Sequence, residues 1–154
     1  MPIAQTHPAY PKAARYCSYQ DRTEKEVRVK LHALGVTQET EVEQLMQALK
    51  AEKFLDEARY VASFIRGRLV GKQWGRRKIQ RALASKGVAE TLIRQGLAAI
   101  DDAAYLQSLR AVAERKKQAL ADKDPRQQKL TNYLLQKGYE PDLVYQTVQE
   151  LIAS

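Results

Sequence analysis

The chain has little of what disulfide bonding, secretion and membrane insertion require. Its 154 residues include one cysteine, Cys17, so no intrachain disulfide is possible and we expect a reducing, cytoplasmic setting. The first twenty residues contain no apolar run, so we expect no signal peptide. No apolar stretch approaches the roughly 20 residues that a transmembrane helix needs, so a membrane is not among the expected partners.

Side chains for catalysis and metal binding are equally scarce. His7 and His32 lie far apart, with no second cysteine to complete a zinc site. Asp101 and Asp102 form a carboxylate pair, but at an expected helix start they indicate capping. The segment Gly67–Lys72 is one residue too short for a phosphate-binding loop and lacks Ser or Thr after the lysine. We therefore predict a protein that is not an enzyme, with no catalytic residue, no metal and no cofactor.

Glycine and proline are also few, at 7 and 5 residues, and this favours helix. No segment shows the alternation of apolar and polar residues that is typical of a half-buried strand. The composition therefore predicts an all-α protein.

Three glycines divide this helical sequence into similar parts. Gly35, Gly87 and Gly138 are separated by 52 and 51 residues. An aliphatic residue stands eight positions before each glycine and a leucine four positions before it. Each copy therefore predicts a short amphipathic helix that ends at a glycine in the left-handed conformation, followed by a second helix.

Capping signals mark where several helices begin. Thr23 and Glu26 have the spacing of a capping box, and Pro11 is expected to open a short leading helix through Tyr19. Asp124 is expected to cap a helix that starts at the proline after it, and Pro141 to open the last helix. Two further helices are expected over residues 56 to about 70 and 102 to about 121, with Asp56 and either Asp101 or Asp102 as their N-caps.

We combine these signals into tandem three-helix repeats. The expected parts are an N-terminal segment with a short helix over residues 1–20, repeat 1 over 21–72, a basic repeat 2 over 73–122 and a partial repeat 3 over 123–154.

The middle of the chain carries the whole net charge of +8. Residues 53–100 hold 11 Lys or Arg against 3 Asp or Glu, and no acidic residue occurs between Glu57 and Glu90. A solvated basic face is the ordinary explanation of such a cluster, but interspersed carboxylates are missing and arginine, which suits phosphate oxygens, predominates. We therefore predict a nucleic-acid-binding site. Its expected residues are Arg66, Arg68, Lys72, Arg76, Arg77, Lys78, Arg81 and Lys86.

Trp74 lies inside this basic segment and has two interpretations. An indole could stack on an unstacked base. A lone tryptophan at a helix junction is more often buried in the core, and Gly75 beside it indicates close backbone packing. Both interpretations remain open at this point.

Several segments, in order, resemble the RecX family of bacterial recombination regulators. The resemblance starts near Ala13–Cys17 and Arg22–Val27 and is strongest in Phe54–Val61 (FLDEARYV) and Trp74–Ile79 (WGRRKI), which Leu83, Lys86 and Gly87 follow. Ala82 stands where the family often has glutamate, and Trp74 where many members have a smaller or polar residue.

The resemblance implies a fold of tandem three-helix units in an elongated, curved array. It also implies binding to the RecA recombinase filament on single-stranded DNA, with restraint of its ATPase and strand exchange. Two alternatives stay open: a general nucleic-acid-binding helical protein without a recombinase partner, and a helical adaptor that binds only protein. A monomer is the default expectation.

Overall fold

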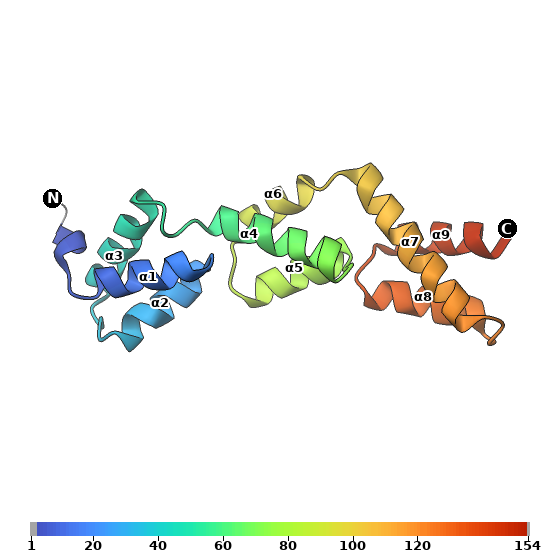
Figure 1. The fold of residues 1–154 in the computed structure, drawn as a ribbon, viewed down its shortest axis with the longest axis horizontal. Coiled ribbons are helices and arrows are strands. Elements are labelled where there is room, and N and C mark those ends of the chain that lie inside the picture. The colour runs from blue at the N-terminus through green and yellow to red at the C-terminus, as the bar shows by residue number, and fades with distance from the viewer. Residues whose placement is uncertain (1–2, 154) are drawn as a thin grey trace. The chain divides into compact units, whose positions relative to one another are not determined.

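The computed structural model describes residues 3–153, which form nine α-helices, a short 3₁₀ turn η1 and a π-helical turn η2 (Figure 1). No strand occurs among these residues, so the all-α prediction is confirmed. The chain divides into two compact units. The first unit comprises residues 3–63 and 84–93, and the second comprises 64–83 and 94–153.

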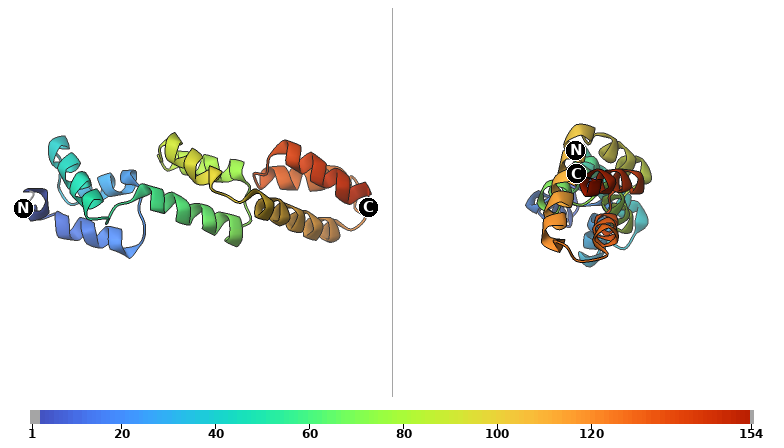
Figure 2. Two further views of the ribbon diagram at one scale, coloured as in Figure 1. Left: turned by 90° about the horizontal axis from the view of Figure 1, so that it is seen from above. Right: turned by 90° about the vertical axis from the view of Figure 1, so that its right-hand side faces the viewer.

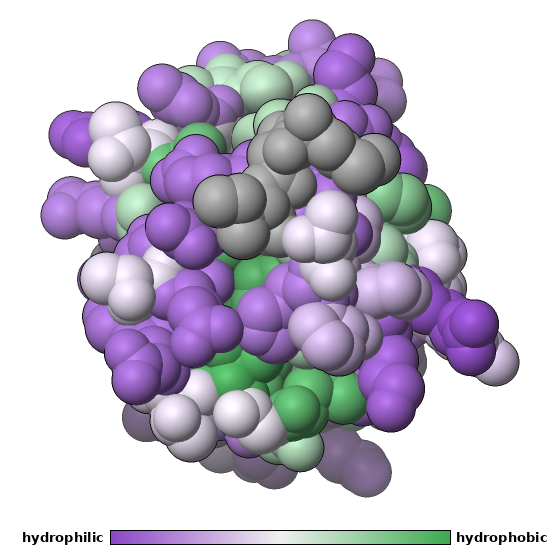
Figure 3. Space-filling model, turned by 90° about the vertical axis from the view of Figure 1, so that its left-hand side faces the viewer, coloured by the Kyte–Doolittle hydropathy of each residue, from purple (hydrophilic) through white to green (hydrophobic). Residues whose placement is uncertain are grey.

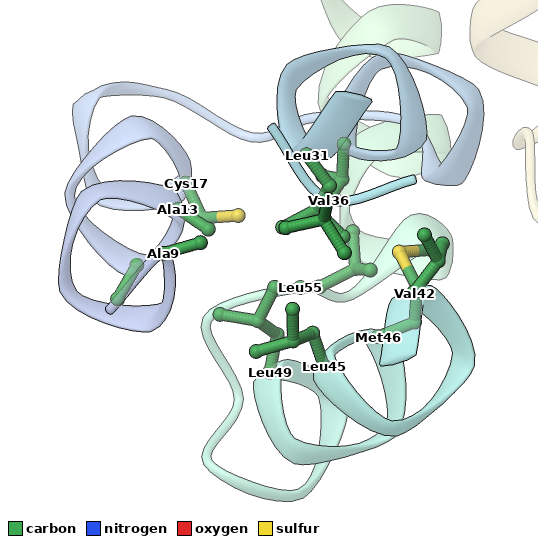
Figure 4. Packing of buried hydrophobic residues seen from close by; sticks show 12 residues of the cluster. Ala9, Ala13, Cys17, Leu31, Val36, Val42, Leu45, Met46, Leu49 and Leu55 are labelled. Carbon is green, nitrogen blue, oxygen red and sulfur yellow. The ribbon is translucent and has the colours of Figure 1, made fainter. Parts of the chain in front are cut away.

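The first unit packs three helices around one apolar core. Its elements are η1 (Ile3–Thr6), α1 (Tyr10–Tyr19), α2 (Glu24–Ala33), α3 (Glu39–Ala51) and the first part of α4 (Glu57–Arg66). Figure 4 shows Ala13 and Cys17 of α1 facing Leu31 of α2, with Leu45 and Leu49 of α3 beside them. These side chains lie one or two helical turns apart on their own helices, so each helix contributes one apolar stripe.

The second unit ends in another three-helix bundle. Its elements are η2 (Gly67–Gly71), most of α5 (Arg76–Ser85), the second part of α6 (Glu90–Ala98), α7 (Asp102–Leu120), α8 (Arg126–Gln136) and α9 (Pro141–Ala153). The last three helices lie side by side, as Figures 1 and 2 show. Their shared core includes Leu109 and Val112 of α7, Leu130 and Leu134 of α8 and Val148 of α9.

Most of the predicted caps are present. The Thr23 hydroxyl accepts a hydrogen bond from the Glu26 amide at 3.1 Å, and the Glu26 carboxylate accepts one from the Thr23 amide at 2.8 Å. Asp56 and Asp101 cap α4 and α7 in the same way, each accepting from the amide three residues later. The capping box and both aspartate caps are therefore confirmed.

The start of α8 differs from the prediction. Pro125 itself stands in the N-cap position and the helix begins at Arg126, without a side-chain cap. Asp124 consequently lies one residue too early to reach the first free amides of the helix, so its predicted role as the cap is wrong.

The three repeated glycines end their helices in the left-handed conformation. The φ angles of Gly35, Gly87 and Gly138 are 92°, 79° and 97°. A residue with a Cβ atom is strained at such angles, which explains why the sequence returns to glycine at this point.

No helix in the described part of the chain is long and apolar enough to cross a membrane. Figure 3 shows one face of the molecule, on which hydrophilic side chains predominate and hydrophobic ones reach the surface in a smaller central area.

Candidate nucleic-acid interface

The predicted basic residues lie on three consecutive elements. Arg66 ends α4, Arg68 lies in η2 and Lys72 follows it; four more stand on α5, namely Arg76, Arg77, Lys78 and Arg81. These seven residues all belong to the second unit, and we call them the basic segment. Lys86 follows α5 and belongs to the first unit, where it lines a small pocket with Tyr16 and Lys25.

A tight backbone contact fixes the beginning of α5. The Gly75 amide donates to the Lys137 carbonyl at 2.7 Å, and the Arg77 amide donates to the Gly138 carbonyl at 3.0 Å. A Cβ atom on Gly75 would lie 2.2 Å from the Gly138 carbonyl carbon and 2.2 Å from the Tyr139 nitrogen. The close packing expected at Gly75 is therefore present, and it anchors α5 on the turn between α8 and α9.

Trp74 lies beside two cations of the basic segment. The Lys78 ammonium is 4.5 Å and the Arg68 guanidinium 5.3 Å from the centre of its ring. Arg68 also lies over the Phe64 ring, at 4.3 Å. Trp74 is half-buried, so it is not a fully buried core residue and part of its side chain reaches the surface. These cation–π contacts hold Arg68 and Lys78 close to an aromatic face.

Arg76 differs from its neighbours because its donors are used within the fold. Its guanidinium donates to Glu140 at 2.9 Å and to Asp102 at 2.5 Å, and it lies 3.8 Å from the centre of the Tyr105 ring. The Tyr105 hydroxyl accepts from the Arg76 amide at 2.9 Å and donates to Glu140 at 2.5 Å. Burial, and then the hydrogen bond to Glu140, raise the pKa of Tyr105. This arrangement gives Arg76 a structural role, so its donors are not free for an outside anion.

Four other cations of the basic segment are available to an outside anion. Arg66, Lys72, Arg77 and Arg81 are exposed, and none forms an ion pair with a carboxylate of residues 3–153. Arginine side chains in this state can donate in parallel to two phosphate oxygens.

The two units differ sharply in charge. The first contains 10 Lys or Arg and 10 Asp or Glu, whereas the second contains 16 against 8. The second unit therefore carries the whole net charge of +8. From the sequence alone we located this excess in residues 53–100 and counted the last third of the chain as neutral. The predicted site therefore did not include basic side chains of α7 and α8. The signal that could have found them is local, since residues 110–137 hold 8 Lys or Arg and 3 Asp or Glu.

The described residues offer no cluster for a metal ion, and the one cysteine is buried. No group of three His, Cys, Asp or Glu side chains could hold a metal ion among them. Cys17 is 3% exposed, and burial is the main cause that raises the pKa of its thiol. A thiol in such a site is poorly suited to react as a thiolate.

The fold and the basic segment together define an all-α protein of tandem three-helix units with one strongly electropositive part. Three family models match the chain one after another, and each describes one three-helix domain. The first three-helix domain of RecX matches residues 9–54, the second matches 56–97 and the third matches 103–148. The chain belongs to the RecX family, a family of regulatory proteins, as the resemblance implied.

Individual relatives agree with this assignment. The regulatory protein RecX of Prosthecochloris aestuarii is 29% identical over 154 residues, which are 100% of both chains. The regulatory protein RecX of Clostridium perfringens strain 13 is 34% identical over 134 residues, which are 84% of this chain and 62% of the relative. The chain thus spans less than two thirds of the length of the clostridial protein.

Solved structures show the same fold. A crystal structure of RecX from Lactobacillus salivarius is 26% identical with a TM-score of 0.86, and the match covers 95% of this chain and 96% of that one. A crystal structure titled as regulatory protein RecX is also 26% identical, with a TM-score of 0.81 over 96% of this chain and 72% of that one.

The family models group the helices differently from our predicted boundaries. Each RecX domain begins one helix earlier than the repeats expected at 21–72, 73–122 and 123–154. The leading helix α1 therefore joins the first domain, and α7 joins α8 and α9 in a third domain with three helices. The packing of α7 against α8 and α9 around one core is the physical reason for this grouping.

Proposed function

We propose that this protein binds the RecA recombinase filament on single-stranded DNA and modulates it, in the inhibitory direction. The observation that carries the proposal is the combination of three RecX domains with a net charge confined to the second unit. A charge gathered in one part of a molecule creates a directed field, and a filament with DNA at its centre presents phosphates to it.

The proposed mechanism needs no catalytic residue and no cofactor. Exposed cations of the basic segment contact the phosphates, while neutral parts of the chain contact neighbouring recombinase subunits. Bridged subunits cannot cycle or extend, so ATP hydrolysis and strand exchange slow down. The protein acts in the cytoplasm as a monomer, and Arg66, Lys72, Arg77 and Arg81 supply the phosphate contacts, with Lys78 beside Trp74.

The test is the single-stranded-DNA-dependent ATPase of the RecA from the same organism, measured with and without the protein. We expect inhibition at sub-stoichiometric protein and its loss in the double variant Arg77→Glu/Arg81→Glu. Both side chains are exposed and lie four residues apart, on the same side of α5, so the change removes charge without removing core packing.

The matched control is Lys12→Glu/Arg15→Glu, which makes the same change in net charge on exposed positions of α1 in the neutral first unit. We expect this control to inhibit like the unmodified protein. Equal loss of inhibition in both variants would mean that net charge, and not the basic segment, is responsible.

A general nucleic-acid-binding protein is the second candidate, because the unpaired cations of α5 would bind DNA without a recombinase. On single strands, each phosphate contact adds about 0.7 to the slope of log affinity against log salt. DNA binding with a steep salt slope but no effect on the RecA ATPase would support this candidate and contradict the first. Inhibition without any DNA binding would indicate an adaptor that contacts only protein.

A further inference from the structure

A second cluster of cations and an aromatic ring lies in the third domain, outside the basic segment. The Lys116 ammonium of α7 is 4.5 Å and the Lys137 ammonium 5.7 Å from the centre of the Tyr133 ring of α8. All three side chains are half-buried, so each still reaches the surface. We call these three residues the Tyr133 cluster.

The carboxylates of the third domain do not neutralise this cluster. Neither Lys116 nor Lys137 forms an ion pair within the part of the chain that the structure describes, and the same is true of the exposed Arg115. Acidic side chains of this domain pair with three other arginines instead. The pairs are Asp102 and Glu140 with Arg76, Glu114 and Glu150 with Arg110, and Asp122 with Arg126. A neutral charge count over residues 101–154 therefore conceals a locally positive surface.

The Tyr133 cluster is continuous with the basic segment, and both lie in the second unit. The Lys137 ammonium donates to the Lys72 carbonyl at 3.1 Å, and the Arg115 guanidinium donates to the Gln73 side chain at 2.5 Å. Next to Lys137, Gly138 lies so close to Lys78 that a Cβ atom on the glycine would be 2.3 Å from the lysine Cβ. The loop around Trp74 and the end of α8 thus form one surface.

This surface repeats one arrangement twice. Trp74 has two cations near its ring and Tyr133 has two near its own, and Lys137 at the Tyr133 ring donates to the carbonyl of Lys72, two residues before Trp74. Proteins that bind single strands without sequence preference combine a basic track for the backbone with aromatic rings on which bases stack. An ordinary solvated basic face would not have aromatic rings beside its cations. An aromatic residue of the core would not have cations without ion pairs beside it.

We propose that the Tyr133 cluster is a second contact site for single-stranded DNA, which extends the track begun by the basic segment onto the third domain. Tyr133 provides a ring on which an unstacked base lies, and Lys116 and Lys137 move from the ring to the flanking phosphates. The proposal deepens the proposed function, on which it rests for the choice of single-stranded DNA. Gln80 is the only amide side chain on α5 that could read base edges, and α5 has no asparagine, so the track is expected to have little preference for sequence.

The experiment measures binding of the full-length protein to a fluorescein-labelled oligothymidylate by anisotropy over a series of salt concentrations. For Lys116→Gln/Lys137→Gln we expect the salt slope to fall by about 1.4, which corresponds to two lost phosphate contacts. For Tyr133→Leu we expect roughly 5- to 150-fold weaker binding at an unchanged salt slope, because stacking is lost and no charge is removed.

Two controls separate these effects from general ones. Tyr145→Leu removes an exposed tyrosine of α9, 56% exposed, and Lys12→Gln/Arg15→Gln removes two positive charges from the first unit. Both controls are expected to bind DNA like the unmodified protein. Thermal unfolding by circular dichroism checks that each variant is folded.

The inference would be overturned if both Tyr133-cluster variants bound DNA with unchanged affinity and salt slope while Arg77→Glu/Arg81→Glu lost binding. That result would leave the proposed function intact. Failure of the unmodified protein to bind single-stranded DNA would overturn it too, whereas the proposed function is judged separately by the RecA ATPase. If Tyr133→Leu weakened binding to duplex DNA as much as binding to the oligothymidylate, the stacking role of Tyr133 would be refuted, since paired bases cannot lie on its ring.

Discussion

Replacing Gly75 by alanine tests whether the second and third domains are joined as the structure indicates. The added methyl carbon would lie 2.2 Å from two backbone atoms, the Gly138 carbonyl carbon and the Tyr139 nitrogen, and 2.4 Å from the Gly138 oxygen. Backbone atoms cannot rotate away as a flexible side chain can, so the two segments must separate. Two backbone hydrogen bonds cross the same contact, to the carbonyls of Lys137 and Gly138.

The expected loss of stability follows from these two contributions. Overpacking a filled site costs about 1–3 kcal/mol, and each weakened hydrogen bond contributes about 0.5–1.5 kcal/mol. Alanine restricts the unfolded chain more than glycine does, which returns about 0.4–1 kcal/mol. We therefore expect Gly75→Ala to lower the free energy of unfolding by about 3 kcal/mol. For a chain of this length that corresponds to a decrease in Tm of about 6–12 °C.

The assay is thermal unfolding followed by circular dichroism at 222 nm, a wavelength at which helix loss is measured directly. Gly67→Ala is the matched control, because no heavy atom lies within 4 Å of its added Cβ atom and its φ angle is ordinary. We expect the control to melt at the same temperature as the unmodified protein or slightly above it. A Gly75→Ala variant that melts with the control would refute the close contact between α5 and the turn after α8.

Two further changes test the first unit. Gly87→Val places a β-branched residue at a φ angle of 79°, so we expect a loss of about 1–3 kcal/mol in urea unfolding, and an unchanged midpoint would contradict the left-handed cap. Glu57 is 8% exposed, and burial is the main cause that raises its pKa above the ordinary 4.5. Because the folded state holds this proton more tightly than the unfolded chain, stability should decline as pH rises from about 4.5 through the raised pKa. Glu57→Gln keeps an oxygen that accepts from the Glu24 amide, so we expect it to remove that decline; urea unfolding at several pH values would show an equal decline in both proteins if the reasoning is wrong.

The helices and most of their ends could be predicted because their signals are local. The capping box at Thr23 and the glycine caps at Gly87 and Gly138 depend on residues within one or two turns of the chain. The N-cap of α8 was mispredicted for a related reason: Asp124 and Pro125 permit two positions for the first turn, and no neighbouring residue distinguishes them.

The candidate site could be predicted only in outline. Arg76 and Arg77 are adjacent and chemically identical, yet the carboxylates that bind Arg76 lie 26 and 64 residues away along the chain. Likewise, nothing near Lys137 in the sequence indicates that it meets Lys72, which lies 65 residues away. These contacts depend on how α5, α7 and α8 pack, and no local pattern encodes that packing.

The sequence by itself determined the all-α fold, the repeat of about 50 residues and the concentration of positive charge, since composition, periodicity and spacing express all three. Its motifs also carried the resemblance to the RecX family. Only the tertiary structure decided that α7 packs with α8 and α9 around one core, which arginine is used inside the fold and which lysines of the third domain join the basic surface. The physical reason is that ion pairs, cation–π contacts and close backbone packing act through space over a few ångströms, between residues that the chain separates widely.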